Sequence, residues 1–83
     1  MAKTESNLYE NYLTDLCIII KENAIKAKKE SELSKNTKNK DYSLGYLMAY
    51  HEIVSLIQQQ AKVFQIPLNK IKMENINPEK EIL

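Results

Sequence analysis

Arginine and tryptophan are absent from this sequence, and cysteine, histidine and glycine occur only once each in its 83 residues. The single Cys17 has no second cysteine with which to form an intramolecular disulfide. One cysteine and one histidine do not complete the ligand set of a structural zinc site. We therefore expect no metal and no cofactor. Short chains often gain stability from disulfides, metals or oligomerisation, and oligomerisation is the route that this composition leaves open.

Long apolar runs are missing as well. The apolar run over residues 16–20 is short, whereas a membrane-spanning helix needs about 20 apolar residues. The first twenty residues include three acidic side chains, which do not fit the basic start of a secretory signal. We expect a cytoplasmic protein without a membrane partner. We also expect one small domain over residues 1–83, with disordered ends at residues 1–6 and 78–83.

Positive charge comes from lysine alone and is unevenly distributed. Residues 21–40 hold seven lysines and three acidic residues, which gives this segment a net charge of +4. Sequence-specific recognition of nucleic acid relies on the planar fork of arginine, which this chain lacks. Nucleic-acid binding through the lysine patch that begins at Lys21 and ends at Lys40 is therefore a less favoured function.

Apolar residues recur with a helical period over residues 7–33 and again over residues 42–65. Residues 34–41 contain no apolar side chain and predict a loop. Pro67 disfavours helix beyond the second segment. The stripes that we expect to be buried comprise Tyr9, Leu13, Leu16, Ile20 and Ala27 in the first helix, and Tyr46, Leu47, Tyr50, Ile53, Val54, Ile57, Ala61 and Phe64 in the second. The pattern predicts an all-α fold, an antiparallel two-helix hairpin with a short C-terminal turn.

The second helix carries more apolar surface than one partner helix can bury. The surplus residues form the predicted interface, together with two isoleucines of the first helix: Gly45, Met48, Ala49, Leu56, Gln60, Val63, Ile18 and Ile25. Soluble monomers tend to avoid such an exposed patch. Self-association into a homodimeric four-helix bundle is one explanation, in which Gly45 and Ala49 allow close approach of two backbones. Docking of another protein is the second; we favour the first because symmetric dimers are common.

Few residues invite a catalytic interpretation. His51 could serve as a general base, yet the sequence places no nucleophile beside it, and a metalloprotease helix needs two histidines. Cys17 lies in an apolar run, where a buried thiol behaves as a small inert hydrophobe. Tyr42, Tyr46 and Tyr50 follow one another at four-residue spacing, which is typical of a packed aromatic stripe. We expect no catalytic site.

The second helix and the residues after it resemble a group of small bacterial helical proteins. The shared pattern is a glycine, then Met-Ala-Tyr, then Gln-Gln-Gln-Ala and a phenylalanine before a proline. The matching residues are Gly45, Met48, Ala49, Tyr50, Ser55, Leu56, the run 58–61, Phe64 and Pro67. No activity is assigned to that group, so the resemblance implies no role for any of these residues.

The sequence therefore predicts a protein that is not an enzyme. We expect a small helical protein–protein interaction module or adaptor that acts as a homo-oligomer, most simply a homodimer. The alternative is an antitoxin, immunity or secretion-chaperone type of protein, whose apolar face caps a specific protein partner.

Overall fold

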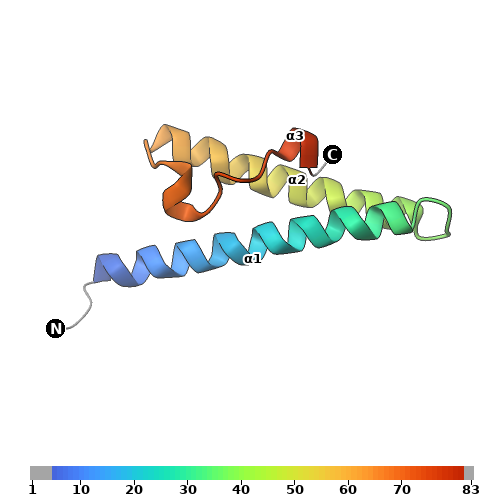
Figure 1. Ribbon diagram of the computed structural model, residues 1–83, viewed down its shortest axis with the longest axis horizontal. Helices are drawn as coiled ribbons and strands as arrows, with labels where there is room; N and C mark the ends of the chain where they lie inside the picture. The colour runs from blue at the N-terminus through green and yellow to red at the C-terminus, as the bar shows by residue number, and fades with distance from the viewer. Residues whose placement is uncertain (1–4, 82–83) are drawn as a thin grey trace.

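The computed structural model describes residues 5–81 and consists mainly of two long antiparallel helices (Figure 1). Helix α1 spans Glu5–Leu33 and helix α2 spans Lys40–Val63. A short 3₁₀ helix, η1, spans Leu68–Ile71, and a single turn of helix, α3, spans Pro78–Glu81. No strand occurs among the described residues. The predicted all-α hairpin is confirmed, with helix boundaries within two residues of those expected from the period.

The connection between the helices is short and held by local hydrogen bonds. The Thr37 hydroxyl donates to the Ser34 carbonyl oxygen at 2.8 Å and accepts from the Asn39 amide at 3.2 Å. These contacts replace part of the helical hydrogen bonding that ends at Leu33. Helix α2 then begins at Lys40, two residues earlier than predicted, because the chain needs only the segment 34–39 to reverse its direction.

Small and medium side chains form the contact line between the two helices. The fully buried residues of α1 are Cys17, Ala24 and Ala27, and they face the buried residues Leu47, Val54 and Ala61 of α2. Each set recurs at intervals of three, four or seven positions, which keeps it on one side of its helix. Small side chains allow the two backbones to approach closely along this seam.

The expectation that both apolar stripes are fully buried is wrong. Tyr9, Leu13 and Leu16 keep 65%, 39% and 39% of their surface exposed, and Tyr46, Ile53 and Phe64 are also exposed. Ile20, Tyr50 and Ile57 are half-buried. A helix facing one neighbour buries only a limited arc of its circumference, and each predicted stripe is wider than that arc. The arc that is buried lies toward one side of the stripe, on the side where the C-terminal segment packs.

Helix α2 ends in a Schellman-type turn that reverses the chain. Gln65 adopts the left-handed conformation with a φ of 57°, and the Ile66 amide donates to the Ala61 carbonyl oxygen at 2.7 Å. Pro67 is extended and leads directly into η1. The predicted short turn opened by Pro67 is thus present, and it brings the chain back over the hairpin.

The segment after α2, residues 66–81, returns along one side of the hairpin, and we call it the C-terminal strap (Figure 1). Ile71, Met73 and Ile76 of the strap belong to the same buried cluster as the seam between the helices. Met73 is completely buried. The strap therefore completes the core, since the seam of small residues contributes little volume by itself.

The sequence predicts disorder at residues 78–83, and within this range the structure describes residues 78–81 as a helical turn. Pro78–Glu81 form α3, and the Asn77 side-chain oxygen accepts hydrogen bonds from the backbone amides of Glu79 and Lys80 at 3.0 and 3.4 Å. This is the capping interaction that fixes a helix start. Of the predicted disordered ends, residues 1–4 and 82–83 lie outside the described residues, whereas Glu5 is the first residue of α1.

The molecule is elongated, with principal extents of 54, 24 and 16 Å. Its radius of gyration is 15.0 Å. A compact domain of this length has a radius of gyration of about 12 Å. The elongated shape leaves much of the surface of both long helices uncovered.

Candidate protein-interaction surface

The hairpin has two broad faces, and the strap covers only one of them. On this covered face the Thr14 hydroxyl and the Lys21 ammonium of α1 donate to strap carbonyl oxygens. His51 and Gln58 of α2 also contact the strap. The positions on the other side of each helix make up the opposite face, which we call the open face.

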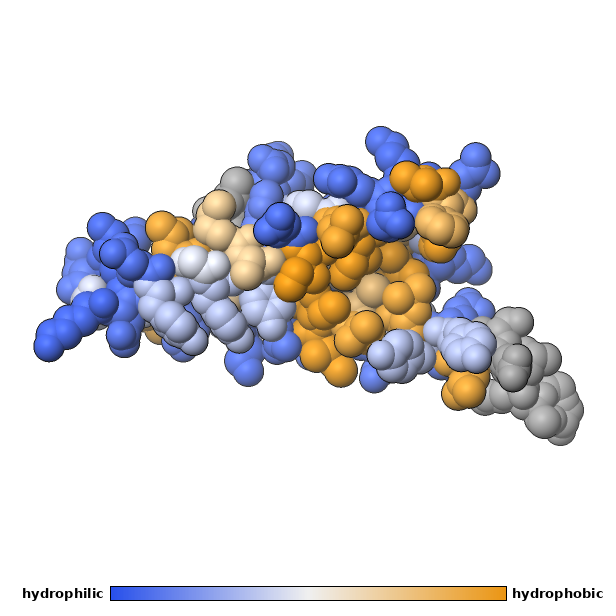
Figure 2. Space-filling view, turned by 180° about the vertical axis from the view of Figure 1, so that it is seen from behind, coloured by the Kyte–Doolittle hydropathy of each residue, from blue (hydrophilic) through white to orange (hydrophobic). Residues whose placement is uncertain are grey.

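Eight exposed apolar or aromatic residues define the open face: Tyr9, Tyr12, Leu13, Leu16, Tyr42, Tyr46, Ile53 and Phe64. Helical spacing puts each group on one side of its helix, away from the strap contacts. A shallow hollow between the helices, toward the loop end, is lined by Asn23, Lys26, Ala27 and Glu30 of α1 together with Tyr42, Ser43 and Tyr46 of α2. This hollow shows that the two groups share one face. Figure 2 shows a continuous apolar area on one face of the molecule.

The open face carries no charge over most of its length. Helical spacing places no acidic or basic side chain on this side of α1 between Tyr9 and Asn23, or of α2 between Tyr42 and Phe64. Protein surfaces ordinarily intersperse charged residues, and large uncharged apolar areas mark binding sites. The central part of protein interfaces is likewise depleted of charge and enriched in tyrosine.

Three tyrosines form a ladder at the loop end of the open face. The Tyr42 and Tyr46 rings stack with centroids 6.2 Å apart, and the Tyr46 and Tyr50 rings meet edge to face at 5.3 Å. A side-chain hydrogen bond to Tyr50, followed by charge repulsion from the Tyr50 phenolate, raises the pKa of Tyr46. The predicted aromatic stripe therefore exists. However, Tyr42 and Tyr46 present their rings to solvent, with 75% and 48% of their surface exposed.

The residues predicted as an interface are divided between different surfaces. Gly45, Met48, Ala49 and Leu56 border a shallow depression on the outer side of α2, which Glu52 and Glu79 also line. Gln60 and Val63 are exposed, but they do not line this depression. Ile18 is half-buried and Ile25 is 44% exposed, and both lie on α1. We call the row of Gly45, Ala49, Leu56 and Val63 the outer line; its role as an interface stays a prediction.

Gly45 has no neighbour within 4 Å of the position that a Cβ atom would occupy. Within this chain, therefore, nothing requires a glycine there. The expected close approach of a second backbone at Gly45 also stays a prediction.

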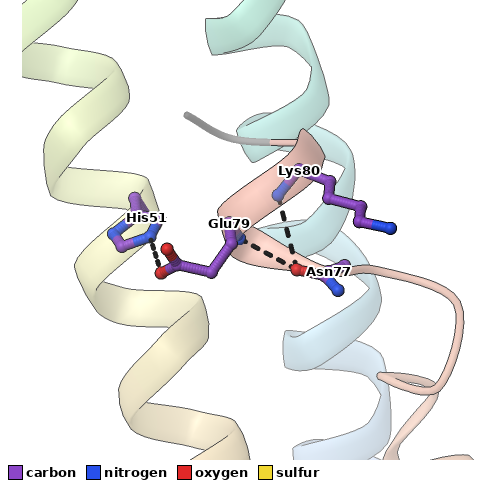
Figure 3. A network of polar contacts seen from close by, with 4 residues as sticks. All are labelled: His51, Asn77, Glu79 and Lys80. Carbon is purple, nitrogen blue, oxygen red and sulfur yellow. Dashed lines mark hydrogen bonds and ion pairs between the residues drawn. The ribbon is translucent and has the colours of Figure 1, made fainter.

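The only histidine belongs to the strap attachment. Its Nε2 atom lies 3.2 Å from Oε2 of Glu79, so that α3 is tied to the middle of α2 (Figure 3). Glu79 is the residue whose amide is capped by Asn77, and one short polar network thus joins the start of α3 to α2. This structural contact accounts for His51 without a catalytic partner.

Polar side chains of both long helices bind the backbone of the strap. The Gln58 amide nitrogen donates to the carbonyl oxygens of Met73 and Ile76 at 3.3 and 2.9 Å. On α1, the Lys21 ammonium donates to the Lys72 carbonyl oxygen at 2.8 Å. Lys72 itself is in the left-handed conformation, with a φ of 61°. The strap is irregular, so its carbonyl groups have no helical or sheet partners. These side-chain hydrogen bonds satisfy them instead.

Cys17 lies in the seam and is only 1% exposed. Burial raises the pKa of its thiol. A buried thiol with a raised pKa is a poor nucleophile, in keeping with the predicted packing role. Among residues 5–81, no three histidine, cysteine or acidic side chains come together in a way that could hold a metal ion.

Comparison of the chain with protein-family models, with curated proteins and with solved structures gave no match. The resemblance of the second helix to small bacterial proteins stays a prediction. No helix in the described part of the chain is long and apolar enough to span a membrane.

The open face was missed from the sequence because its residues were assigned to the core. Periodicity identifies an apolar side of a helix, but it does not say which half of a wide stripe faces the neighbour. The sequence feature that indicates which side of the stripes is buried lies in the strap. Ile71, Met73 and Ile76 are apolar residues in a polar segment, and their burial on one side of the seam leaves the other side uncovered.

Proposed function

We propose that this protein is a non-enzymatic interaction module that acts as a homo-oligomer, and that apolar surface left uncovered by the hairpin is its binding surface. The observation that carries the proposal is the open face. Leu16, Ile53 and Phe64 are 39%, 40% and 69% exposed on a face whose charged side chains, Lys26 and Glu30, lie toward the loop end. Exposed apolar surface of this kind is costly in water and is stabilised when a partner buries it.

The placement of the reactive residues supports a non-enzymatic role. His51 is engaged with Glu79 of the strap, and Cys17 is buried in the seam on the other helix. A general base needs to lie within hydrogen-bond reach of the group that it activates. Neither residue has such a neighbour in the contacts of the described chain.

Binding of nucleic acid by the lysine patch has weaker support. Lys21 donates to a strap carbonyl oxygen, and Lys28 lies 3.8 Å from the Glu32 carboxylate. Lys21 and Lys28 therefore have partners among the described residues, and Glu22 and Glu30 are interspersed with the lysines of residues 21–40. Retention on a nucleic-acid column that weakens with salt would be the sign of this function.

The molar mass of the purified protein tests the proposal. Sedimentation equilibrium or light scattering at tens of micromolar should give at least twice the 9.7 kDa mass of the chain. A monomer at that concentration contradicts the homo-oligomer. It would leave the capping of a different protein, as an antitoxin, immunity or chaperone-type protein does, as the function to test next.

A further inference from the structure

We propose that the open face is the site where a second copy of this chain docks, with the two hairpins running antiparallel to form a four-helix bundle. This inference rests on the proposed function, since it assigns the surface and the direction of the homo-oligomer. It moves the interface from the outer line of α2 to the face that both helices build together.

The exposed area of the chain is large enough for such a dimer. The chain exposes 6420 Å². A compact folded monomer of this mass exposes about 5,100 Å². The excess is on the order of 1,300 Å², whereas each partner in a standard interface contributes about 800 Å². The elongated hairpin therefore has enough exposed area for a second copy, and we place that copy on the exposed apolar residues of the open face.

The chemistry of the open face fits a copy of itself better than the outer line does. An interface related by a two-fold axis places each surface against the same surface of the partner, so a charge near the axis meets an identical charge. The open face has aliphatic residues at its middle, Leu16 and Ile53, and no charge there. The outer line borders a depression that Glu52 and Glu79 also line, and pairing it with itself would bring acidic groups together.

Charge also decides the direction of the second copy. The loop end of the hairpin exposes Lys35, Lys38 and Lys40, whereas Glu10 and Asp15 lie toward the other end of α1. Parallel hairpins would place two lysine-rich loops side by side. Antiparallel hairpins separate the two lysine-rich loops and bring each one to an end of the partner that carries both signs of charge, with Glu10 and Asp15 on α1 and Lys62 at the end of α2. The tyrosine ladder of one copy then covers the Tyr9 end of the other.

A matched pair of substitutions on α2 tests the surface. Ile53→Glu places a carboxylate in the middle of the open face, and Leu56→Glu places the same group on the outer line, less than one turn away. Both residues are exposed in the single chain, at 40% and 57%, so both variants should keep their helicity. We expect Ile53→Glu to weaken the dimer at least tenfold and Leu56→Glu to leave its dissociation constant within about threefold of wild type, because an unpaired buried charge is strongly unfavourable.

A variant on the other helix guards against a folding defect in the first. Leu16→Glu reaches the same face from α1 and should weaken the dimer to a similar extent, with circular dichroism as the control for helicity. A dimer that resists both Ile53→Glu and Leu16→Glu but falls apart with Leu56→Glu would overturn the assignment and support the outer line. In that case the wild-type protein would still be a dimer, in agreement with the proposed homo-oligomer, and only the assignment of the interface to the open face would fail.

The distance between the two loops tests the direction. Asn36→Cys in a Cys17→Ala background allows one spin label to be attached at each loop, and the label-to-label distance can be measured by pulsed electron paramagnetic resonance. Antiparallel hairpins should give a distance comparable with the 54 Å length of one molecule. A distance comparable with its 24 Å width would indicate parallel hairpins and contradict the inference.

Discussion

The covered and open faces of this hairpin begin from similar sequence and end in different environments. Both draw on wide apolar stripes of α1 and α2. On the covered face, Met73 of the strap is completely buried against the seam, and Gln58 and Lys21 bind the strap backbone. On the open face, Leu16 and Ile53 are exposed to 39% and 40%. A short irregular segment, rather than either long helix, therefore decides which apolar surface is core and which is available.

The difference also shows how polar groups contribute to burial. The strap needs side chains such as Gln58 to satisfy its carbonyl oxygens, because an irregular segment has no hydrogen-bonded ladder. A helical partner on the open face would bring its own backbone hydrogen bonds already satisfied. The open face accordingly consists of apolar and aromatic side chains with few polar contacts.

Removing the main apolar contact of the strap should have the largest effect on stability. Met73→Ala deletes most of a completely buried side chain, and we expect a loss of about 2–5 kcal/mol in the free energy of unfolding. Met48→Ala is the matched control, since Met48 is 47% exposed and should lose less than about 1 kcal/mol. Urea unfolding followed by circular dichroism measures both. Equal losses would mean that the strap does not complete the core.

Removing the polar attachment of the strap should have a smaller effect. Gln58→Ala leaves the carbonyl oxygens of Met73 and Ile76 without their side-chain donor, and we expect a loss of about 1–3 kcal/mol. Gln59→Ala changes the same residue type at an exposed neighbouring position and should stay within about 0.5 kcal/mol of wild type. If the two variants unfold at the same urea concentration, the Gln58 bonds do not hold the strap.

A substitution at Gly45 distinguishes the open face from the outer line, and it should change the stability of the chain only modestly. Nothing lies within 4 Å of its missing Cβ, and alanine is the better helix former by about 1 kcal/mol. With the second copy on the open face, Gly45→Ala should raise the thermal midpoint and leave the molar mass unchanged. A loss of dimer in this variant would instead place a partner backbone against Gly45.

We expect the smallest effect for Cys17, whose buried thiol should make the free energy of unfolding depend on pH. Burial raises the pKa of Cys17 above its ordinary value of 9.0, so the folded protein holds the thiol proton more tightly than the unfolded chain does. The corresponding stability is present below the unfolded pKa and is lost as the pH rises toward the folded pKa. The wild type should therefore lose stability relative to Cys17→Ala as the pH is raised past about 9. Urea unfolding at a series of pH values checks this, and titration of Tyr46 affects both proteins alike. A pH-independent difference would show that water reaches the thiol.

The long helices could be predicted from the sequence because their signals are local. The apolar period, the apolar-free segment 34–41 and Pro67 together predict the boundaries of α1 and α2 to within two residues. Cys17 in an apolar run was expected to be buried, and it is. Each of these inferences depends on a few neighbouring residues.

The rotation of the helices and the course of the strap could not be predicted in the same way. Leu16, Ile53 and Phe64 have the apolar spacing of core residues, and only the burial of Met73 in the strap shows that the buried arc lies toward the other side of the stripe. The bonds from Thr14 and Lys21 to the strap join residues 56 and 51 positions apart. Nothing in the local sequence around either partner indicates such a contact.

These long separations have a consequence for the order in which the chain becomes structured. The helices are joined by the short connection 34–39, so their first contacts close a small loop, whereas the strap closes loops of more than fifty residues onto α1. Loop-closure entropy grows with length, and contacts between distant residues form late in folding. We therefore expect the hairpin to come together with both faces bare, and we expect the strap to dock on one of them afterwards. Local attachment of the strap by Gln58 and His51 on α2, close to it in sequence, favours this docking.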